Sequence, residues 1–338
     1  MTNSMDIVYQ FNEEYAPYAG VSITSVVANN KDNTIRFHIL GEDLSEDSVC
    51  RLKSLENSKI TLLFYDTEKV IEEMKQMNLP TYRKSYAANL RMFLPDLLGR
   101  EIKRVLYLDA DTIVTKNVRN LFDIDINAYC AAMVLDSLAA KHGMLIGMDE
   151  SDWYFNSGVM LFNLEKWREE KYTEKIVNHI KNIRTAYPSP DQDLINIVCK
   201  SQIMLLPMEY NFQPIHKILS IKCYQRTFMQ KRYYSSEEIE NAAEKVKILH
   251  CFRFLGEFPW HENNLHPFAK EFDSYLAISP WSGYEKKKAD CKLILRIEKV
   301  LFKILPHDIW GYIFYIVHSL FIRKTNKMCQ NNQVNKLM

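Results

Sequence analysis

The sequence has few of the residues that build flexible linkers or disulfide scaffolds. Only 9 of its 338 residues are glycine and 11 are proline, which leaves little material for a long mobile connection between domains. Its seven cysteines are scattered without any Cys-x-x-Cys pair, and an odd number in a chain this large argues against a disulfide framework. We therefore expect one compact body with an appendage, in a reducing compartment.

An export signal and two common nucleotide-binding motifs are also missing. The start MTNSMDIVYQF lacks the basic region and apolar stretch of a secretory signal, so we expect a cytoplasmic protein. Neither Gly-x-Gly-x-x-Gly nor Gly-x-x-x-x-Gly-Lys-Ser/Thr occurs, so the sequence supports neither a dinucleotide fingerprint nor a P-loop. A nucleotide would have to be held in another way.

Charge is divided unevenly along the chain. Residues 286–338 contain 11 Lys and Arg against 3 Asp and Glu, whereas the rest contains 32 against 39, which gives net charges of +8 and −7. An acidic body does not favour a polyanion, whereas a basic, aromatic tail suits an anionic membrane surface. We expect no nucleic-acid partner and a membrane contact through the tail.

The tail carries a helical pattern. Apolar residues recur at helical spacing between Asp290 and Leu305, four basic residues form a stripe beside them, and Pro306 ends the helix. The stretch 309–322 is shorter than the roughly 20 apolar residues that span a bilayer, so we expect it to lie in the interface. Packing of this helix on the body or on a partner subunit is the alternative. The aromatic side chains expected at headgroup depth are Trp310, Tyr312, Phe314, Tyr315 and Phe321.

Apolar runs alternate with amphipathic segments over the first two thirds of the chain. The runs are MDIVYQF, IRFHIL, ITLLFYD, RVLYLDAD and CAAMVLD. This alternation predicts an α/β fold with a mixed, mostly parallel sheet and a Rossmann-like nucleotide-binding half. Helices are predicted to begin after Asn12 and at Ser45, and later over 165–183 and 191–200.

The sharpest local signal is a buried strand that runs directly into two acids, VLYLDADTIV at 105–114. Asp109 and Asp111 would follow the carboxyl end of the strand, which is the edge where open α/β sheets bind ligands. Two hard oxygen donors there suit Mg²⁺ or Mn²⁺ bridging a diphosphate. An Asp-x-Asp pair can also merely cap the turn that follows it. Whether this pair binds a metal therefore depends on what other segments of the sequence show.

Three later segments supply that context: FNSGVMLFNL at 155–164, PDQDLIN at 190–196, and His250 ahead of Pro259-Trp260. In this order and spacing the chain resembles glycosyltransferase family eight, the retaining, metal-dependent enzymes that include bacterial lipopolysaccharide α-galactosyl- and α-glucosyltransferases and glycogenin. The resemblance covers about residues 5–265. It implies a GT-A fold with a catalytic domain over 1–285. The membrane-associating tail expected from charge and helical pattern follows over 286–338.

The resemblance also implies the reaction. A galactose or glucose would move from a UDP-sugar to a hydroxyl of a glycan acceptor, such as lipopolysaccharide or another cell-envelope glycan. Asp109, Asp111 and His250 would ligate Mn²⁺, with Mg²⁺ as a substitute, so that the ion neutralises the departing UDP. A lipid-linked acceptor would explain the tail and place the protein at the inner face of the cell membrane.

Other residues match the family's donor-binding and catalytic positions. Gln192 would lie beneath the anomeric carbon, and since an amide is a poor nucleophile, we favour front-face attack with a phosphate oxygen as the base. Asp191, like Asn156, would hydrogen-bond hydroxyls of the sugar, and Asp136 would lie near the donor and acceptor. The donor-binding residues implied are Gln10, Asn12, Glu14, Tyr15, Arg91, Asp109, Ala110, Asp111, Asn156, Ser157, Asp191, Gln192, Arg253 and Gly256.

One segment departs from the family pattern. The family has a Lys directly before the Pro-Trp pair, whereas this chain reads HCFRFLGEFPW, with Phe258 in that position. Arg253 is the local substitute, because a guanidinium can clamp diphosphate oxygens. The missing Lys motivates the alternative of a non-catalytic, membrane-associated protein that binds sugar nucleotides or glycans. A haloacid-dehalogenase-type phosphatase fits less well, because its Asp-x-Asp motif lies near the N-terminus.

Overall fold

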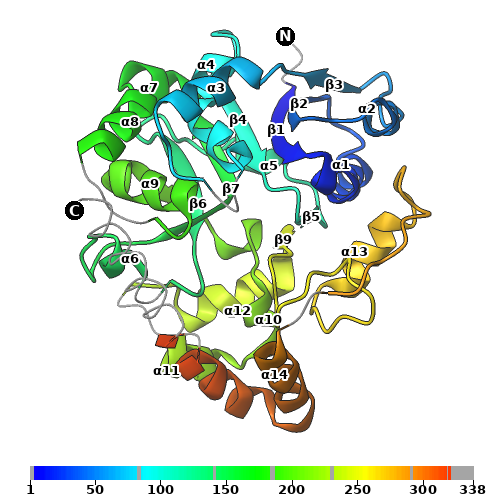
Figure 1. Ribbon diagram of the computed structural model, residues 1–338, viewed down its shortest axis with the longest axis vertical. Helices are drawn as coiled ribbons and strands as arrows, with labels where there is room; N and C mark the ends of the chain where they lie inside the picture. Colours follow the sequence, from blue (N-terminus) through cyan, green and yellow to red (C-terminus); the bar gives the residue numbers. More distant parts are fainter. Residues whose placement is uncertain are drawn as a thin grey trace.

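The computed structural model describes most of the chain (Figure 1). The ranges described are 4–81, 85–139, 142–182, 187–228, 232–289, 292–317 and 319–320.

A seven-stranded sheet with the order β3-β2-β1-β4-β7-β6-β8 forms the centre of the molecule. Strands β3, β2, β1 and β4 run parallel, as do β6 and β8, whereas β7 is antiparallel to both of its neighbours. The prediction of a mixed, mostly parallel sheet with a Rossmann-like half is therefore confirmed. The strands are β1 (Met5–Asn12), β2 (Ile35–Glu42), β3 (Ile60–Phe64), β4 (Arg104–Leu108), β6 (Ala131–Leu135), β7 (Phe155–Asn163) and β8 (Ile203–Leu205).

Helices surround this sheet. Of the later helices, α10, α11, α12 and α14 gather at one end of the molecule, at the bottom of Figure 1, whereas α13 lies beside α1. The α-helices are α1 (Ala16–Asn29), α2 (Glu46–Lys53), α3 (Glu68–Gln76), α4 (Leu94–Leu97), α5 (Arg119–Phe122), α6 (His142–Leu145), α7 (Leu164–Glu169), α8 (Tyr172–Asn182), α9 (Pro190–Val198), α10 (Pro214–Ile218), α11 (Ile221–Phe228), α12 (Ser236–Lys245), α13 (Ala269–Leu276) and α14 (Leu293–Ile304). Short 3₁₀ helices are η1 (Glu13–Tyr15), η2 (Ala87–Phe93), η3 (Lys200–Gln202) and η4 (Met208–Tyr210).

Local sequence signals explain several helix boundaries. The side chain of Asn12 accepts a hydrogen bond from the backbone N–H of Tyr15, and that of Ser45 accepts one from Ser48, so both predicted starts are confirmed. The single helix predicted over 165–183 is wrong: Lys171 has φ of 56°, a left-handed conformation that separates α7 from α8.

A second, two-stranded sheet joins distant parts of the chain. Strand β5 (Thr112–Val114) pairs antiparallel with β9 (Ile248–His250), and Thr112 lies opposite His250. Since β5 begins directly after Asp111, this pairing brings the late histidine to the Asp-x-Asp segment.

In the tail, the structure contradicts the expectation that Trp310 lies at the depth of lipid headgroups. Trp310 is fully buried and Phe302 nearly so, which means that the body and not a lipid headgroup surrounds the indole. Helix α14 is followed by a second helix over 307–317. Lys287 accepts a backbone bond from Glu262, so contacts with the body continue past residue 285, and the division into two domains stays a prediction.

Among the described residues, none of the helices is long and apolar enough to cross a membrane. Asp290 and Phe321, which the tail prediction names, lie outside the described residues.

Candidate active site

A cavity of about 640 Å³ opens where β1, β4 and β6 end and β7 begins. Because β7 is antiparallel to β4 and β6, its first residues reach the same edge of the sheet as their last ones. All but one of the predicted site residues line this cavity, and Gly256 is the exception. They are Gln10, Asn12, Glu14, Tyr15, Arg91, Asp109, Ala110, Asp111, Asp136, Asn156, Ser157, Asp191, Gln192, His250 and Arg253.

Several lining residues were missed at the level of sequence. Most are small or apolar and carry no chemical signal, whereas Tyr107 could have been found, because it precedes Asp109 by two positions and points to the same side of the chain. The missed residues are Phe11, Ser85, Ala87, Ala88, Tyr107, Leu138, Ser189, Phe252 and Phe258, the last of which the sequence marked only as the replacement of a lysine.

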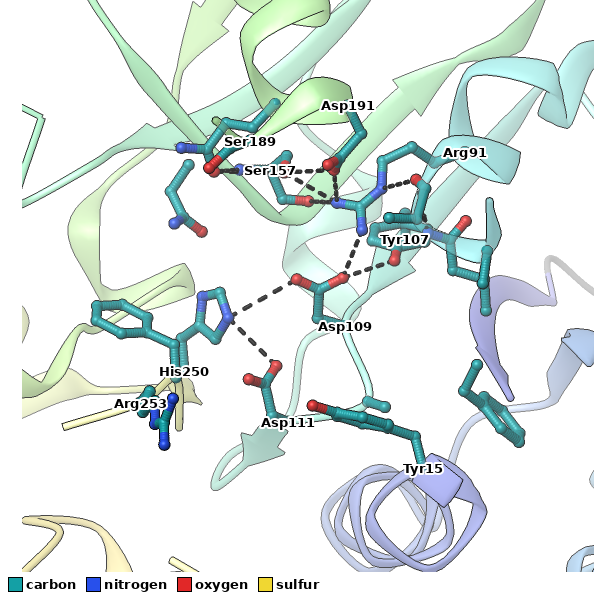
Figure 2. A pocket seen from close by; sticks show the side chains of 18 of the residues that line it. Tyr15, Arg91, Tyr107, Asp109, Asp111, Ser157, Ser189, Asp191, His250 and Arg253 are labelled. Carbon is teal, nitrogen blue, oxygen red and sulfur yellow. Dashed lines mark hydrogen bonds and ion pairs between the residues drawn. The ribbon is translucent and has the colours of Figure 1, made fainter. Parts of the chain in front are cut away.

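Two carboxylates and one imidazole converge in the cavity (Figure 2). The Nε2 atom of His250 lies 3.3 Å from a carboxylate oxygen of Asp111 and 3.8 Å from one of Asp109. One ligand atom from each of the three residues lies within 4.8 Å of the others. Neighbouring ligands of an octahedral ion at about 2.1 Å lie about 3 Å apart, so this oxygen, oxygen and nitrogen set fits a divalent cation.

Neighbouring residues hydrogen-bond Asp109 and His250 and thereby determine which of their atoms face the centre of this cluster. The Oδ1 atom of Asp109 accepts hydrogen bonds from Arg91 and from the hydroxyl of Tyr107, which leaves Oδ2 toward His250. The Nδ1 atom of His250 lies 3.1 Å from the side-chain oxygen of Asn211 and donates to it, so Nε2 is free to act as a ligand. Burial alone would lower the pKa of His250, but the charge of Asp111 raises it overall.

Arg91 links the two acidic segments of the cavity. Its guanidinium bonds Asp109 at 2.8 Å and Asp191 at 3.2 Å, and it also donates to the backbone oxygen and hydroxyl of Ser157 (Figure 2). Burial lowers the pKa of Arg91, but the two carboxylates outweigh this and raise it, so the side chain stays charged. It comes from η2, a 3₁₀ helix.

The amide of Gln192 is held in one orientation. Its Nε2 donates to Asp136 at 3.2 Å and to the hydroxyl of Tyr154 at 3.1 Å, while its oxygen accepts from the backbone N–H of Ser157 at 3.0 Å. Asp136 also accepts from Asn156 at 3.0 Å. The arrangement therefore fixes which end of the amide is oxygen.

A buried acid, Asp193, lies behind Gln192 and was not predicted as part of the site. Its carboxylate accepts a 2.5 Å hydrogen bond from Tyr154 and lies 2.7 Å from Nε2 of His142. Burial lowers the pKa of His142, but its bond with Asp193 outweighs that and raises it. His142, Asp193 and Tyr154 thus form a chain of polar contacts that ends on the Gln192 amide.

The segment after His250 presents Arg253 to the cavity from the side opposite Arg91 (Figure 2). Leu255 and Gly256 have φ of 51° and 77°, and Phe254 and Glu257 exchange two backbone hydrogen bonds around them, which makes a two-residue hairpin turn. The carbonyl of Gly256 accepts from Nε of Arg253 at 2.8 Å. Gly256 therefore acts on the cavity through Arg253.

The remaining wall is formed by the segment after β1. The side-chain nitrogen of Gln10 donates to the carbonyl of Ala88, and its oxygen is buried without a hydrogen-bond partner among the described residues. Asn12 caps η1, and Glu14 and Tyr15 follow it at the rim.

The mixed sheet, the acidic pair at the end of β4 and the late histidine define a GT-A fold. The chain matches the family model described as "Glycosyl transferase family 8" over residues 6–264. It therefore belongs to glycosyl transferase family 8, a family of glycosyltransferases, and the resemblance stated from the sequence is confirmed.

Individual relatives agree with this assignment. The chain is 29% identical to a lipopolysaccharide 1,2-glucosyltransferase of Escherichia coli K12, over 87% of this chain and 83% of that protein. It is 30% identical to general stress protein A of Bacillus subtilis, over 82% and 95%. A solved structure of the galactosyltransferase LgtC, in complex with donor and acceptor sugar analogs, superposes with a TM-score of 0.64 at 24% identity, over 82% of this chain and 99% of that one, which shows a shared fold.

Proposed function

We propose that this protein is a retaining hexosyltransferase that moves galactose or glucose from a UDP-sugar to a hydroxyl of a cell-envelope glycan. The observation that carries the proposal is the convergence of Asp109, Asp111 and His250 in a cavity at the strand ends. Membership of family 8 and the name of the E. coli relative support a glycan acceptor of the lipopolysaccharide type.

The base of the donor fits the wall after β1. The nitrogen of Gln10 is fixed on Ala88, and its oxygen has no partner among the described residues, so this oxygen would accept a hydrogen bond from a bound base. The imide N–H of uracil would supply such a donor. Asn12, Glu14 and Tyr15 lie beside it, and the tyrosine ring supplies a stacking surface.

The diphosphate fits between the metal ligands and Arg253. Asp109, Asp111 and His250 would hold Mn²⁺ or Mg²⁺, and the bound ion would neutralise charge that develops on the departing UDP. Arg253 supplies a guanidinium next to His250, on the side of the cavity opposite Arg91. Phe258 stands where the family has a lysine, and its uncharged ring stacks on Trp260 with centroids 4.4 Å apart. Arg253 would therefore take over the role of that lysine.

The hexose would then lie against Gln192, Asp136 and Asp191. The bond between the anomeric carbon and the phosphate oxygen breaks with its electron pair on UDP. The acceptor hydroxyl forms the new bond on the same face and gives its proton to a phosphate oxygen. The fixed oxygen of Gln192 stabilises positive charge on the sugar, and Asn156 and Asp191 bond its hydroxyls.

A panel of sugar nucleotides with Mn²⁺ tests this function, read both as UDP release and as ligand-induced thermal stabilisation. We expect a UDP-hexose to give both signals and a GDP-sugar to give neither. Stabilisation by UDP-hexoses without any release of UDP, with or without glycan acceptors, would instead support the non-catalytic binding protein. We place the reaction in the cytoplasm at the inner face of the cell membrane.

A further inference from the structure

The segment that carries Arg253 has two sides. Phe252, Arg253 and Phe258 line the cavity, whereas residues 254–257 between them are buried. The hairpin turn over 254–257 therefore presents a cation to the cavity through one side and contacts the interior of the protein through the other. What holds the buried side in place also holds the guanidinium.

The peptide unit between Gly256 and Glu257 connects the two sides. Its carbonyl accepts the 2.8 Å hydrogen bond from Nε of Arg253. Its N–H donates to the carbonyl of Phe254 at 2.9 Å. Because a peptide unit is planar, these two bonds cannot change independently. The backbone position of Glu257 therefore determines where the acceptor of the Arg253 side chain lies.

The side chain of Glu257 is held at both carboxylate oxygens. Oε1 pairs with Nζ of Lys299 on α14, and Oε2 accepts a 3.1 Å hydrogen bond from the backbone N–H of Leu265. The glutamate side chain is 7% exposed and that of Lys299 is 19% exposed. An unpaired charge at such a depth is strongly destabilising. Lys299 thus supplies the positive charge that keeps the Glu257 carboxylate in this position.

Aromatic contacts hold α14 against the same turn. The ring of Phe254 lies 5.5 Å from that of Phe302 and 5.6 Å from that of the buried Trp310, measured between centroids. Phe302 follows Lys299 by three positions, so both side chains leave α14 on one face. This face of the helix therefore contacts the turn through an ion pair and through an aromatic cluster.

We propose that Lys299 is a positioning residue for donor binding: through Glu257 it fixes the turn that presents Arg253 to the diphosphate. This role rests on the proposed function and adds to it a residue on α14. Lys299 is not among the described residues that line the cavity, so it acts on the donor only through the turn.

The test measures UDP release by full-length proteins as the UDP-hexose is titrated with Mn²⁺ present. Lys299→Met should raise the apparent Michaelis constant for the donor by about fivefold and leave kcat nearly unchanged, because the guanidinium is displaced but not removed. Lys303→Met is the matched control. It replaces an exposed lysine one turn further along α14 and should behave like wild type.

A second variant separates positioning from stability. Lys299→Met leaves the buried carboxylate of Glu257 without its cation and should lower the melting temperature. Glu257→Gln/Lys299→Met removes both charges and keeps an acceptor for Leu265. In this variant the melting temperature should recover toward wild type, whereas the Michaelis constant for the donor should stay raised, because α14 no longer holds the turn.

Addition of Arg253→Ala decides the route. In that background Lys299→Met should not change the Michaelis constant for the donor any further, because its effect ends on the guanidinium. Multiplication of the two effects, or a donor constant in Lys299→Met equal to that of wild type, would overturn the proposal. So would recovery of the donor constant together with the melting temperature in Glu257→Gln/Lys299→Met. Absence of UDP release by wild type would instead overturn the proposed function, and the role of Lys299 with it.

Discussion

The α-carbon of Gly158 faces the imidazole of His250 so closely that a β-carbon there would come within 2.1 Å of Cε1. The backbone of Gly158 also accepts a 2.8 Å hydrogen bond from the N–H of Asp109. The imidazole of His250 thus packs directly on the backbone of Gly158, the glycine of the FNSGV segment. Its role is to leave space at the metal-ligand set.

Gly158→Ala should displace His250 and weaken metal binding. We expect transfer to fall by about a hundredfold or more, as when charge stabilisation at a leaving group is removed. The measurement is activity and thermal stabilisation as Mn²⁺ is titrated. Gly283→Ala is the matched control, because nothing lies within 4 Å of a β-carbon there. An unchanged Mn²⁺ dependence in Gly158→Ala would contradict this account.

The two acids of the Asp-x-Asp motif should differ in their effect on stability. Asp111→Ala should abolish transfer and change the free energy of unfolding by less than about 0.5 kcal/mol. Asp109→Ala should abolish transfer too, but also destabilise the fold by about 1–3 kcal/mol, because the buried Arg91 loses one of its two carboxylate partners. Urea unfolding of both variants measures this. Full activity of Asp111→Ala, or of wild type in excess chelator, would rule out the metal role.

Arg253→Ala tests the replacement cation. The apparent Michaelis constant for the donor should rise by about tenfold or more, since a hydrogen bond to a charged group contributes about 1.5–3 kcal/mol. Arg253→Lys should recover part of the loss, as the charge remains. Arg226→Ala removes an exposed arginine that does not line the cavity and should have no effect. If UDP affinity and turnover were the same in Arg253→Ala as in wild type, another group would hold the diphosphate.

The pair of His142 and Asp193 predicts a pH dependence of stability. The pKa of His142 is raised in the folded protein, because the pull of Asp193 exceeds the opposing effect of burial. The stabilisation is therefore complete below the ordinary histidine pKa of about 6.5 and is lost as pH rises through the raised value. His142→Gln keeps a donor for Asp193 without a titrating charge. The free energy of unfolding should fall less between about pH 6 and pH 9 in this variant than in wild type. Parallel curves for the two proteins would show that the pair does not titrate in that range.

Much of the fold follows from local signals. The strand that ends at Leu108 was predictable because a continuous apolar run leads into Asp109, and the caps Asn12 and Ser45 mark their helices directly. The break at Lys171 was not, because no glycine or proline marks its left-handed backbone. The prediction that Trp310 contacts lipid was wrong, because Trp310 is buried in the protein. Helical spacing shows that one face of the helix is apolar, but it does not show whether that face contacts protein or lipid.

The site residues that belong to short sequence motifs could be predicted. Those that depend on contacts between distant parts of the chain could not. Asp109, Asp111 and Gln192 lie in short segments with a family pattern, and the structure brings them into one cavity. Asp193 adjoins Gln192 in the same motif, yet only the fold shows that its charge meets His142 across 51 positions of sequence. Such contacts leave no trace in a single sequence.

The pairing of β5 with β9 means that the three metal-ligand candidates become neighbours only when the last third of the chain folds back onto the first. A chain still emerging from the ribosome would contain Asp109 and Asp111 but not yet His250, so under the proposed function a partly made or proteolysed protein could not consume donor. Conversely, an ion held by all three residues would bind only the closed chain and would therefore oppose release of β9 from the body. Cation supply would thus set not only turnover but also how long the C-terminal third resists proteases.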